Sequence, residues 1–360
     1  MAILLCWETE GYNLWLIVVD IVNISSSFRY SFQEKNQRIL PVLNIHNRIP
    51  RQHLATAGGI CAILFWSLTI ALARRISEQV GPVSGATCVY AVSALFGITS
   101  MLRSSAKRHQ IRQLPRAYLL GCGFLFVSYM LLLFLAVGVA DNHNQVLEVG
   151  LVNYLWPALT LLLAIPILGH KAKWMLFPGT VLALSGVFLV LTSSSSAAWH
   201  SFVDNLATNP VAYLLGLAAA LCWAFYSTLT RKWAGDKDSG AVAVFLTITA
   251  LTLFLICFLV EEPRAWNVRV AFEIIVLGAV TFVAYSLWDN SMRQGSIVLV
   301  ASCSYLTPFF STVATCIYLS VVPTLQLWIG CAILIVGSIV SWISIDEKKD
   351  KTFKQQNDPD

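Results

Sequence analysis

The feature that most constrains this chain is a series of apolar runs, each long enough to cross a lipid bilayer. A helix needs about 20 apolar residues to cross the hydrocarbon core of a membrane. In lipid, each backbone amide needs a partner within the protein, so runs of this kind must be helical. The sequence therefore predicts an all-α polytopic membrane protein with ten transmembrane helices, at 54–73, 83–102, 117–138, 146–168, 174–192, 210–230, 240–260, 272–292, 296–319 and 325–345.

The composition agrees with a membrane protein and excludes several other classes. Hydrophobic residues make up 57% of the chain and charged residues only 12%, about half the charged fraction of a soluble domain. The net charge of +5 comes from short basic clusters between apolar runs, so we expect a lipid bilayer as partner and no nucleic acid. HExxH, Walker A, GxSxG and GxGxxG motifs are absent, and the nine cysteines form no C-x-x-C. We expect no enzyme activity, no cofactor, no metal site and no disulfide, and the sequence carries no signal for an oligomeric state.

The distribution of Lys and Arg predicts the orientation of the chain. If the segment before the first run is cytoplasmic, the cytoplasmic segments carry seventeen Lys and Arg, and the outer loops carry only four. This bias predicts that both termini are cytoplasmic. The adjacent Arg74 and Arg75, expected in an outer loop, are a local exception.

Residues 1–53 differ from the rest of the chain and are treated as an N-terminal extension. The apolar stretch Asn13–Ile24 is about half the length of a membrane span and contains Asp20. An interfacial helix is one interpretation, and a translation start further along the chain is another. A signal peptide is less favoured, because no basic segment precedes the stretch and no A-x-A site follows it. Residues 346–360 are expected to form a cytoplasmic tail.

An internal repeat relates the two halves of the chain. Ala62–Arg75 can be aligned with Ala219–Lys232, which places Trp66 on Trp223. Asn153–Pro157 aligns with Ser304–Pro308, and glycines match at the same offset of 151 residues: Gly179 with Gly330, and Gly186 with Gly337. The sequence thus predicts two five-helix repeats, at 54–192 and 193–345.

Five spans are an odd number, so the second repeat is expected to enter the membrane from the opposite side. Inverted repeats of this kind occur in many secondary transporters, where the substrate site lies near the middle of the membrane between the repeats. The alternative is a duplication that only builds a stable helical bundle.

Polar residues and prolines interrupt the fourth and ninth spans at equivalent places. Asn153, Trp156 and Thr160 would share one helix face, and Ser304, Thr307 and Ser311 are their counterparts. Pro157 and Pro308 lack an N–H and would leave the carbonyls of Asn153 and Ser304 free. We expect these helix breaks to face a shared central cavity. The alternative is that the Ser and Thr hydroxyls bond back to their own helices.

Two acidic residues in the spans are candidates for coupling transport to protons. Glu148 follows Asn144, which is a plausible helix N-cap. An acid in the first turn of a helix is stabilised by the helix dipole, and this structural role explains Glu148 as well as a functional role does. Asp289 precedes Arg293 by four residues, which favours a local ion pair. So few acids argue against a site for a strongly charged substrate.

Aromatic side chains within the spans could offer stacking faces and hydroxyls to an aromatic or cationic solute, although packing remains the default for any one of them. With the polar residues near the prolines they make up the predicted substrate cavity: Trp66, Tyr90, Tyr129, Asn153, Tyr154, Trp156, Thr160, Trp223, Tyr226, Tyr285, Trp288, Ser304, Tyr305 and Thr307.

Four stretches of the sequence resemble a known family. They are VSYMLLLFLAVGVADNHNQVLEVGLVNYLWPALTLLLAIPI, FWSLTIALARRISEQVGPVSGA, AYSLWDN and SYLTPFFSTV. They look like the aromatic amino acid exporters of the drug/metabolite transporter superfamily (EamA type), over about residues 54–345.

The resemblance implies both a fold and an activity. The fold has ten helices in two inverted halves, with the fifth and tenth helices peripheral and the other eight around a central cavity. The activity is efflux of aromatic amino acids and other small solutes across the bacterial inner membrane, without ATP hydrolysis. The alternatives are export of another solute, such as a cationic drug, and an intramembrane enzyme or signalling protein, for which the sequence shows no catalytic cluster.

Overall fold

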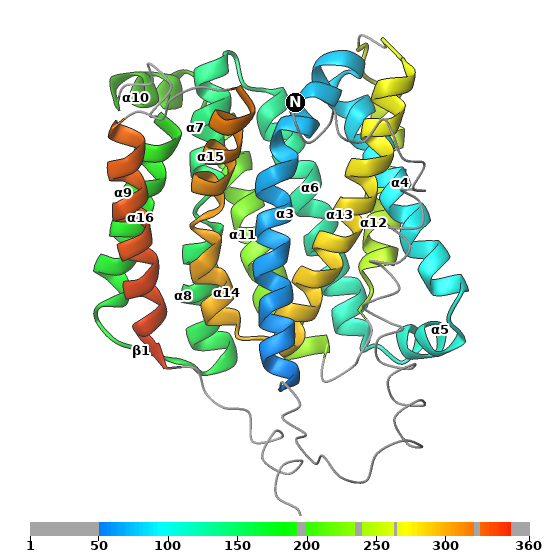
Figure 1. Cartoon of the computed structure of the whole chain (residues 1–360), viewed down its shortest axis with the longest axis horizontal. Helices are drawn as coiled ribbons and strands as arrows, with labels where there is room; N and C mark the ends of the chain where they lie inside the picture. The colour runs from blue at the N-terminus through cyan, green and yellow to red at the C-terminus, as the bar shows by residue number, and fades with distance from the viewer. Residues whose placement is uncertain (1–49, 193–198, 235–239, 263–264, 320–324, 347–360) are drawn as a thin grey trace, which may run out of the picture. The chain divides into compact units, whose positions relative to one another are not determined.

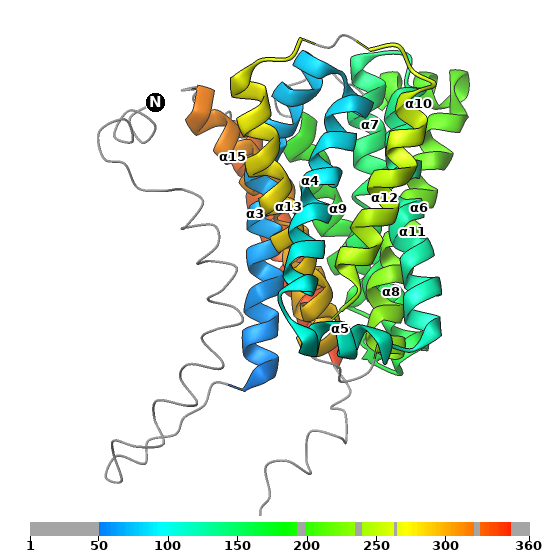
Figure 2. The same ribbon diagram turned by 90° about the vertical axis from the view of Figure 1, so that its right-hand side faces the viewer.

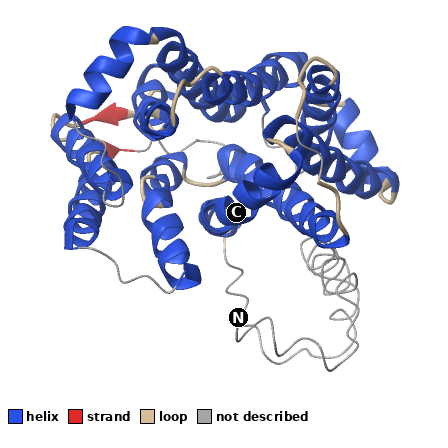
Figure 3. Cartoon of the chain, turned by 90° about the horizontal axis from the view of Figure 1, so that it is seen from above, coloured by secondary structure: helices blue, strands red, loops and turns tan. Residues whose placement is uncertain are grey.

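The described part of the chain is helical, apart from one pair of two-residue strands (Figures 1 and 3). The computed structural model describes residues 50–192, 199–234, 240–262, 265–319 and 325–346. The predicted extension, except for its last four residues, and the predicted tail, except for its first residue, lie outside the described residues. The all-α fold class is confirmed.

The first group of elements ends at residue 192. These elements are α3 (Arg51–Val80), α4 (Pro82–Leu102), α5 (Ser105–Arg112), the π-helix η1 (Ala117–Cys122), α6 (Gly123–Gly138), α7 (His143–Asn153), α8 (Trp156–Leu168), β1 (Lys171–Ala172) and α9 (Leu176–Thr192).

The second group of elements begins at residue 199. They are α10 (Trp199–Thr208), α11 (Pro210–Ala234), α12 (Val242–Cys257), α13 (Val268–Gln294), α14 (Ile297–Ser304), α15 (Thr307–Leu319), α16 (Leu325–Ile343) and β2 (Ile345–Asp346).

Within the described residues, six helical stretches are long and apolar enough to cross a membrane, and seven if the bent helix α3 counts as one span. The apolar helices α9 and α12 are shorter. Large apolar side chains such as Leu95, Phe124 and Leu251 are more than half exposed along the helices. An exposed apolar surface of this extent is unfavourable in water and favourable in lipid. The chain is therefore a multi-pass membrane protein.

The first helix is longer than predicted, and two helices were not predicted. Because α3 continues to Val80, Arg74 and Arg75 lie in the helix rather than in a loop. Both charges are paired there: Arg74 with Glu78 at 2.8 Å, and Arg75 with Glu273 at 3.2 Å. The short helices α5 and α10 were missed because neither has the length or the unbroken apolar run that marks a membrane span.

A two-residue turn interrupts the helix just before each of the two prolines, although Asn144–Leu168 remains one candidate membrane span. A turn separates Asn153 at the end of α7 from Trp156 at the start of α8, and another separates α14 from α15. The predicted stripe of polar residues therefore lies across a break rather than along one helix. The expected free carbonyl at Ser304 is wrong, because the Thr307 hydroxyl donates to it at 2.7 Å. That hydroxyl replaces the N–H that Pro308 lacks.

Helices α9 and α16 pack closely through glycines, and Figure 1 shows them side by side. A Cβ on Gly186 would clash with the backbone of Leu334, and a Cβ on Gly337 would clash with the backbone of Ala183. Contacts that move forward along α9 move backward along α16, so the two helices are antiparallel. Antiparallel pairing of β1 and β2 beside these helices agrees with this. The remaining close contacts, of Gly179 with Ser341 and of Gly330 with Val190, continue the same antiparallel order.

Helices α4 and α12 form a second antiparallel pair (Figure 2). Near the end of α4, a Cβ on Gly97 would lie 2.7 Å from the Cβ of Ala243, at the start of α12. Near the start of α4, Ser84 Oγ lies 3.3 Å from the Sγ of Cys257, at the end of α12. Elsewhere α3 packs against α13, and α11 packs against α6. The predicted repeat relates α3 to α11 and α13 to α6, so these two contacts are counterparts of each other.

Candidate functional site

The indole of Trp223 lies at the centre of a group of aromatic rings that come from both halves of the chain. Its ring centroid is 4.6 Å from Tyr129, 5.8 Å from Trp66, 5.9 Å from Trp288 and 6.3 Å from Trp156. The Trp288 ring is stacked on it, and the Trp66 and Trp156 rings meet it edge-on. Such pairs contribute about 0.5–1.5 kcal/mol each beyond the burial of their area.

We call Trp223, the seven rings in contact with it and Tyr90 the aromatic cluster. Tyr90 joins it through its hydroxyl, which lies 3.4 Å from that of Tyr285. Eight of the ten Trp and Tyr residues of the predicted substrate cavity are in the cluster, all except Tyr154 and Tyr305, and it has one further member, Phe126. Its members are Trp66, Tyr90, Phe126, Tyr129, Trp156, Trp223, Tyr226, Tyr285 and Trp288.

Phe126 was missed by the sequence analysis, although its ring contacts four others of the interior, including those of Trp223 and Tyr285. The predicted substrate cavity contains Trp and Tyr residues but no Phe. The position of Phe126 three residues before Tyr129 on an apolar helix is the signal that would have found it, since residues at this spacing share a helix face.

Other predicted cavity residues lie around the proline breaks, and several of them bond within their own helices. The hydroxyl of Thr160 donates to the Trp156 carbonyl at 2.7 Å, and that of Ser304 donates to the Val300 carbonyl at 2.8 Å. With the Thr307–Ser304 bond, all three hydroxyls follow the alternative in which Ser and Thr bond back to the backbone. Tyr154 and Tyr305 lie in the two breaks, and the Tyr305 ring is fully buried.

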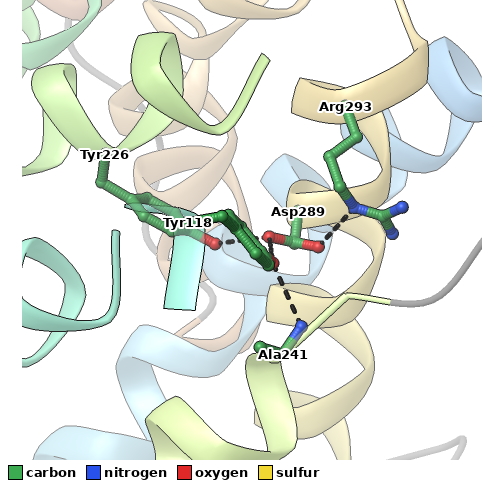
Figure 4. Close-up of polar contacts among 5 residues, drawn as sticks. All are labelled: Tyr118, Tyr226, Ala241, Asp289 and Arg293. Atoms are coloured by element: carbon green, nitrogen blue, oxygen red, sulfur yellow. Dashed lines mark hydrogen bonds and ion pairs between the residues drawn. The ribbon is translucent and has the colours of Figure 1, made fainter. Parts of the chain in front are cut away.

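Asp289 is the centre of a buried polar network near the end of α13 (Figure 4). The hydroxyls of Tyr118 and Tyr226 donate to its Oδ1 at 2.7 and 3.0 Å. The Nε of Arg293 donates to its Oδ2 at 2.8 Å, which confirms the predicted ion pair. Ala241 N in turn donates to the Tyr118 hydroxyl at 3.1 Å. The network therefore links α13 to η1, to α11 and to the residue that precedes α12.

Glu148 is buried in α7. Its hydrogen bonds link α7 to α10 and α11. The Tyr213 hydroxyl donates to its Oε2, and Asn205 Nδ2 lies 3.1 Å from the same oxygen. The predicted N-cap at Asn144 is wrong, because the Oδ1 of Asn142 accepts from Gln145 N at 2.9 Å. Glu148 therefore lies in the second turn of α7, where these partners rather than the helix end stabilise it.

The model of the EamA-like transporter family matches this chain twice, at residues 54–192 and 210–343. The chain belongs to the EamA-like transporter family. This membership confirms the resemblance found in the sequence.

Two curated relatives of this EamA-family chain are named as aromatic amino acid exporters. It is 35% identical over 291 residues to the aromatic amino acid exporter YddG of Escherichia coli (strain K12), with 81% of this chain and 97% of the relative covered. It is 29% identical over 290 residues to the aromatic amino acid exporter YddG of Ancylobacter novellus, with 80% and 96% covered. A crystal structure at 28% identity matches with a TM-score of 0.68 and covers 80% of this chain and 97% of that one. The relatives are transporters, in agreement with the expectation that this EamA-family protein is not an enzyme.

Proposed function

We propose that the chain crosses the membrane ten times, as two inverted five-helix repeats at 54–192 and 193–345. Two pairs of equivalent helices, α4 with α12 and α9 with α16, are antiparallel, as two copies inserted from opposite sides require. The family match to each half supports the duplication. In this arrangement the residues before 54 are an extension, and those from 346 to 360 are a tail.

We propose further that both termini are cytoplasmic and that the membrane is the bacterial inner membrane. The excess of Lys and Arg in the segments assigned to the cytoplasm supports the orientation. The exposed, basic helix α5 would then lie at the cytoplasmic surface. The organisms of the curated exporters, which are bacteria, support the location.

The function that the chain supports best is export of aromatic amino acids and related small amphipathic metabolites by alternating access, without ATP hydrolysis. The observation that carries this proposal is the aromatic cluster, in which rings from both halves of an exporter-like chain meet around Trp223. When an aromatic substrate binds, contacts between its ring and the rings of the cluster would replace some of the contacts that these rings make with one another.

The predicted substrate cavity is kept in this proposal, together with the helix breaks at Pro157 and Pro308. Rings of the aromatic cluster would supply the contacts for the substrate ring. The breaks would let α7 and α8, and likewise α14 and α15, change their relative angle as access alternates. Glu148 and Asp289 are the candidates for proton coupling, because both carboxylates are buried between helices and a proton would change their hydrogen bonds.

Purified protein in liposomes should move labelled Phe, Tyr or Trp down a concentration gradient. The measurement is uptake with and without an imposed pH gradient, and acceleration by the gradient would indicate proton coupling. Empty liposomes are the control. Lack of flux from a folded, correctly reconstituted sample would reject aromatic amino acids as substrates.

A cationic solute is the second candidate, since tryptophan and tyrosine faces also bind cations. Competition in the same liposome assay separates the two. Strong inhibition by unlabelled aromatic amino acids and weak inhibition by aromatic cations would favour the amino acids, and the reverse order would favour the cations.

A further inference from the structure

Two polar atoms beside the aromatic cluster have no hydrogen-bond partner among the described residues. They are the indole N–H of Trp66 and the side-chain oxygen Oδ1 of Asn153, and both atoms are buried. Buried donors and acceptors in native proteins are nearly always paired, with protein, water or ligand. An unpaired donor and an unpaired acceptor in one region therefore need an explanation.

The donor belongs to a ring that contacts Trp223, and the acceptor belongs to a residue beside another ring that contacts Trp223. The Trp66 ring lies 5.8 Å from that of Trp223. The Asn153 amide lies beside the hydroxyl of Tyr129, and the Tyr129 ring lies 4.6 Å from that of Trp223. Trp66 thus contacts Trp223 directly, and Asn153 is linked to it through Tyr129, in the region where the proposed function places the ring of the substrate.

The chemistry of the two atoms selects the groups that they can bind. An indole N–H is only a donor, so it needs an acceptor, and a carboxylate is one. An amide oxygen is an acceptor and pairs with an ammonium group. A zwitterionic amino acid presents both groups and adds no net charge. This suits a region whose nearby formal charges, on Asp289 and Arg293, already neutralise each other.

We propose that Trp66 and Asn153 bind the α-carboxylate and the α-ammonium group of the amino acid, respectively, during transport. This inference rests on the proposed function and adds the basis for recognising an amino acid rather than any aromatic solute. The rings of the aromatic cluster contact the aromatic side chain, and the two polar atoms select its zwitterionic end.

Three competitors test the proposal against labelled phenylalanine exchange in liposomes. Phenylalanine carries both charged groups, 3-phenylpropionate carries only the carboxylate, and 2-phenylethylamine carries only the ammonium. Trp66→Phe keeps a ring but removes the N–H. It should weaken inhibition by phenylalanine and 3-phenylpropionate about ten-fold, the order expected for a hydrogen bond to a charged group, and change 2-phenylethylamine less than about two-fold.

Asn153→Leu removes the oxygen at similar size and should give the opposite pattern. Inhibition by phenylalanine and 2-phenylethylamine should weaken, and inhibition by 3-phenylpropionate should not. Asn153→Asp, which keeps an acceptor, should retain or tighten binding of 2-phenylethylamine, and it preserves the test if Asn153→Leu folds poorly. Trp328→Phe changes an exposed tryptophan of α16 and should leave all three inhibition constants unchanged.

The outcomes separate this inference from the proposed function. If wild-type protein exchanges no labelled phenylalanine, the proposed function fails. If wild type exchanges it but each variant weakens all three competitors equally, or weakens none, the assignment of the two atoms is overturned.

Discussion

At the scale of single residues, Asp289 shows how far a local pattern reaches. Its pairing with Arg293 follows from a spacing of four residues on one helix, and the sequence was enough to predict it. Its hydrogen bonds to Tyr118 and Tyr226 come from positions 171 and 63 residues away. No local pattern could place these hydroxyls, because they reach Asp289 only when η1, α11 and α13 pack together.

Asp289→Asn should strongly destabilise the protein. The change would leave the Arg293 guanidinium, which is 3% exposed, without its carboxylate partner. Breaking one side of a buried ion pair typically costs about 3–5 kcal/mol, because the remaining charge is buried and uncompensated. Thermal unfolding of purified protein in detergent measures the effect.

The double variant Asp289→Asn with Arg293→Gln is the matched control. Removing both charges should recover a large part of the stability lost in the single variant. Unchanged stability in the single variant would show that the ion pair and its hydrogen bonds contribute little to the fold.

At the scale of helices, the two proline breaks can be predicted from the sequence, whereas the register of the antiparallel helix pairs cannot. The breaks at 153–156 and 304–307 follow from the missing N–H of proline, which is a property of the residue itself. The register of α9 on α16 depends on which glycines face which backbone. The sequence marks Gly186 and Gly337 as equivalent, and only packing shows that each meets the partner helix.

Gly186→Ala should destabilise the contact between α9 and α16. The added Cβ would clash with backbone atoms of Leu334, and a helix backbone cannot move aside as the end of a flexible side chain can. Overpacking of this kind typically costs about 1–3 kcal/mol. Gly150→Ala is the control, since nothing lies within 4 Å of a Cβ at that position in α7. The melting temperature in detergent should fall for Gly186→Ala and stay level or rise for Gly150→Ala, and equal changes would contradict this account.

At the scale of the whole molecule, the proposed orientation predicts which segments face each side of the membrane. Cysteines introduced at the exposed positions Gln113, just after α5, and Asp141, between α6 and α7, should lie on opposite sides. A membrane-impermeant maleimide should label Asp141→Cys in intact spheroplasts and label Gln113→Cys only after lysis. Unmodified protein is the control for its own cysteines. The reverse labelling pattern would mean that the chain is inserted the other way up.

The sequence by itself determined the helical membrane class, the proline breaks, the ion pair on α13 and the family. Each of these depends on properties that operate over short stretches of chain, such as the length of an apolar run, a missing N–H or a helical spacing. It did not determine the partners of Glu148 or the place of Phe126 in the aromatic cluster. Tertiary structure decided these, because contacts between residues far apart in the chain depend on how whole helices pack against one another.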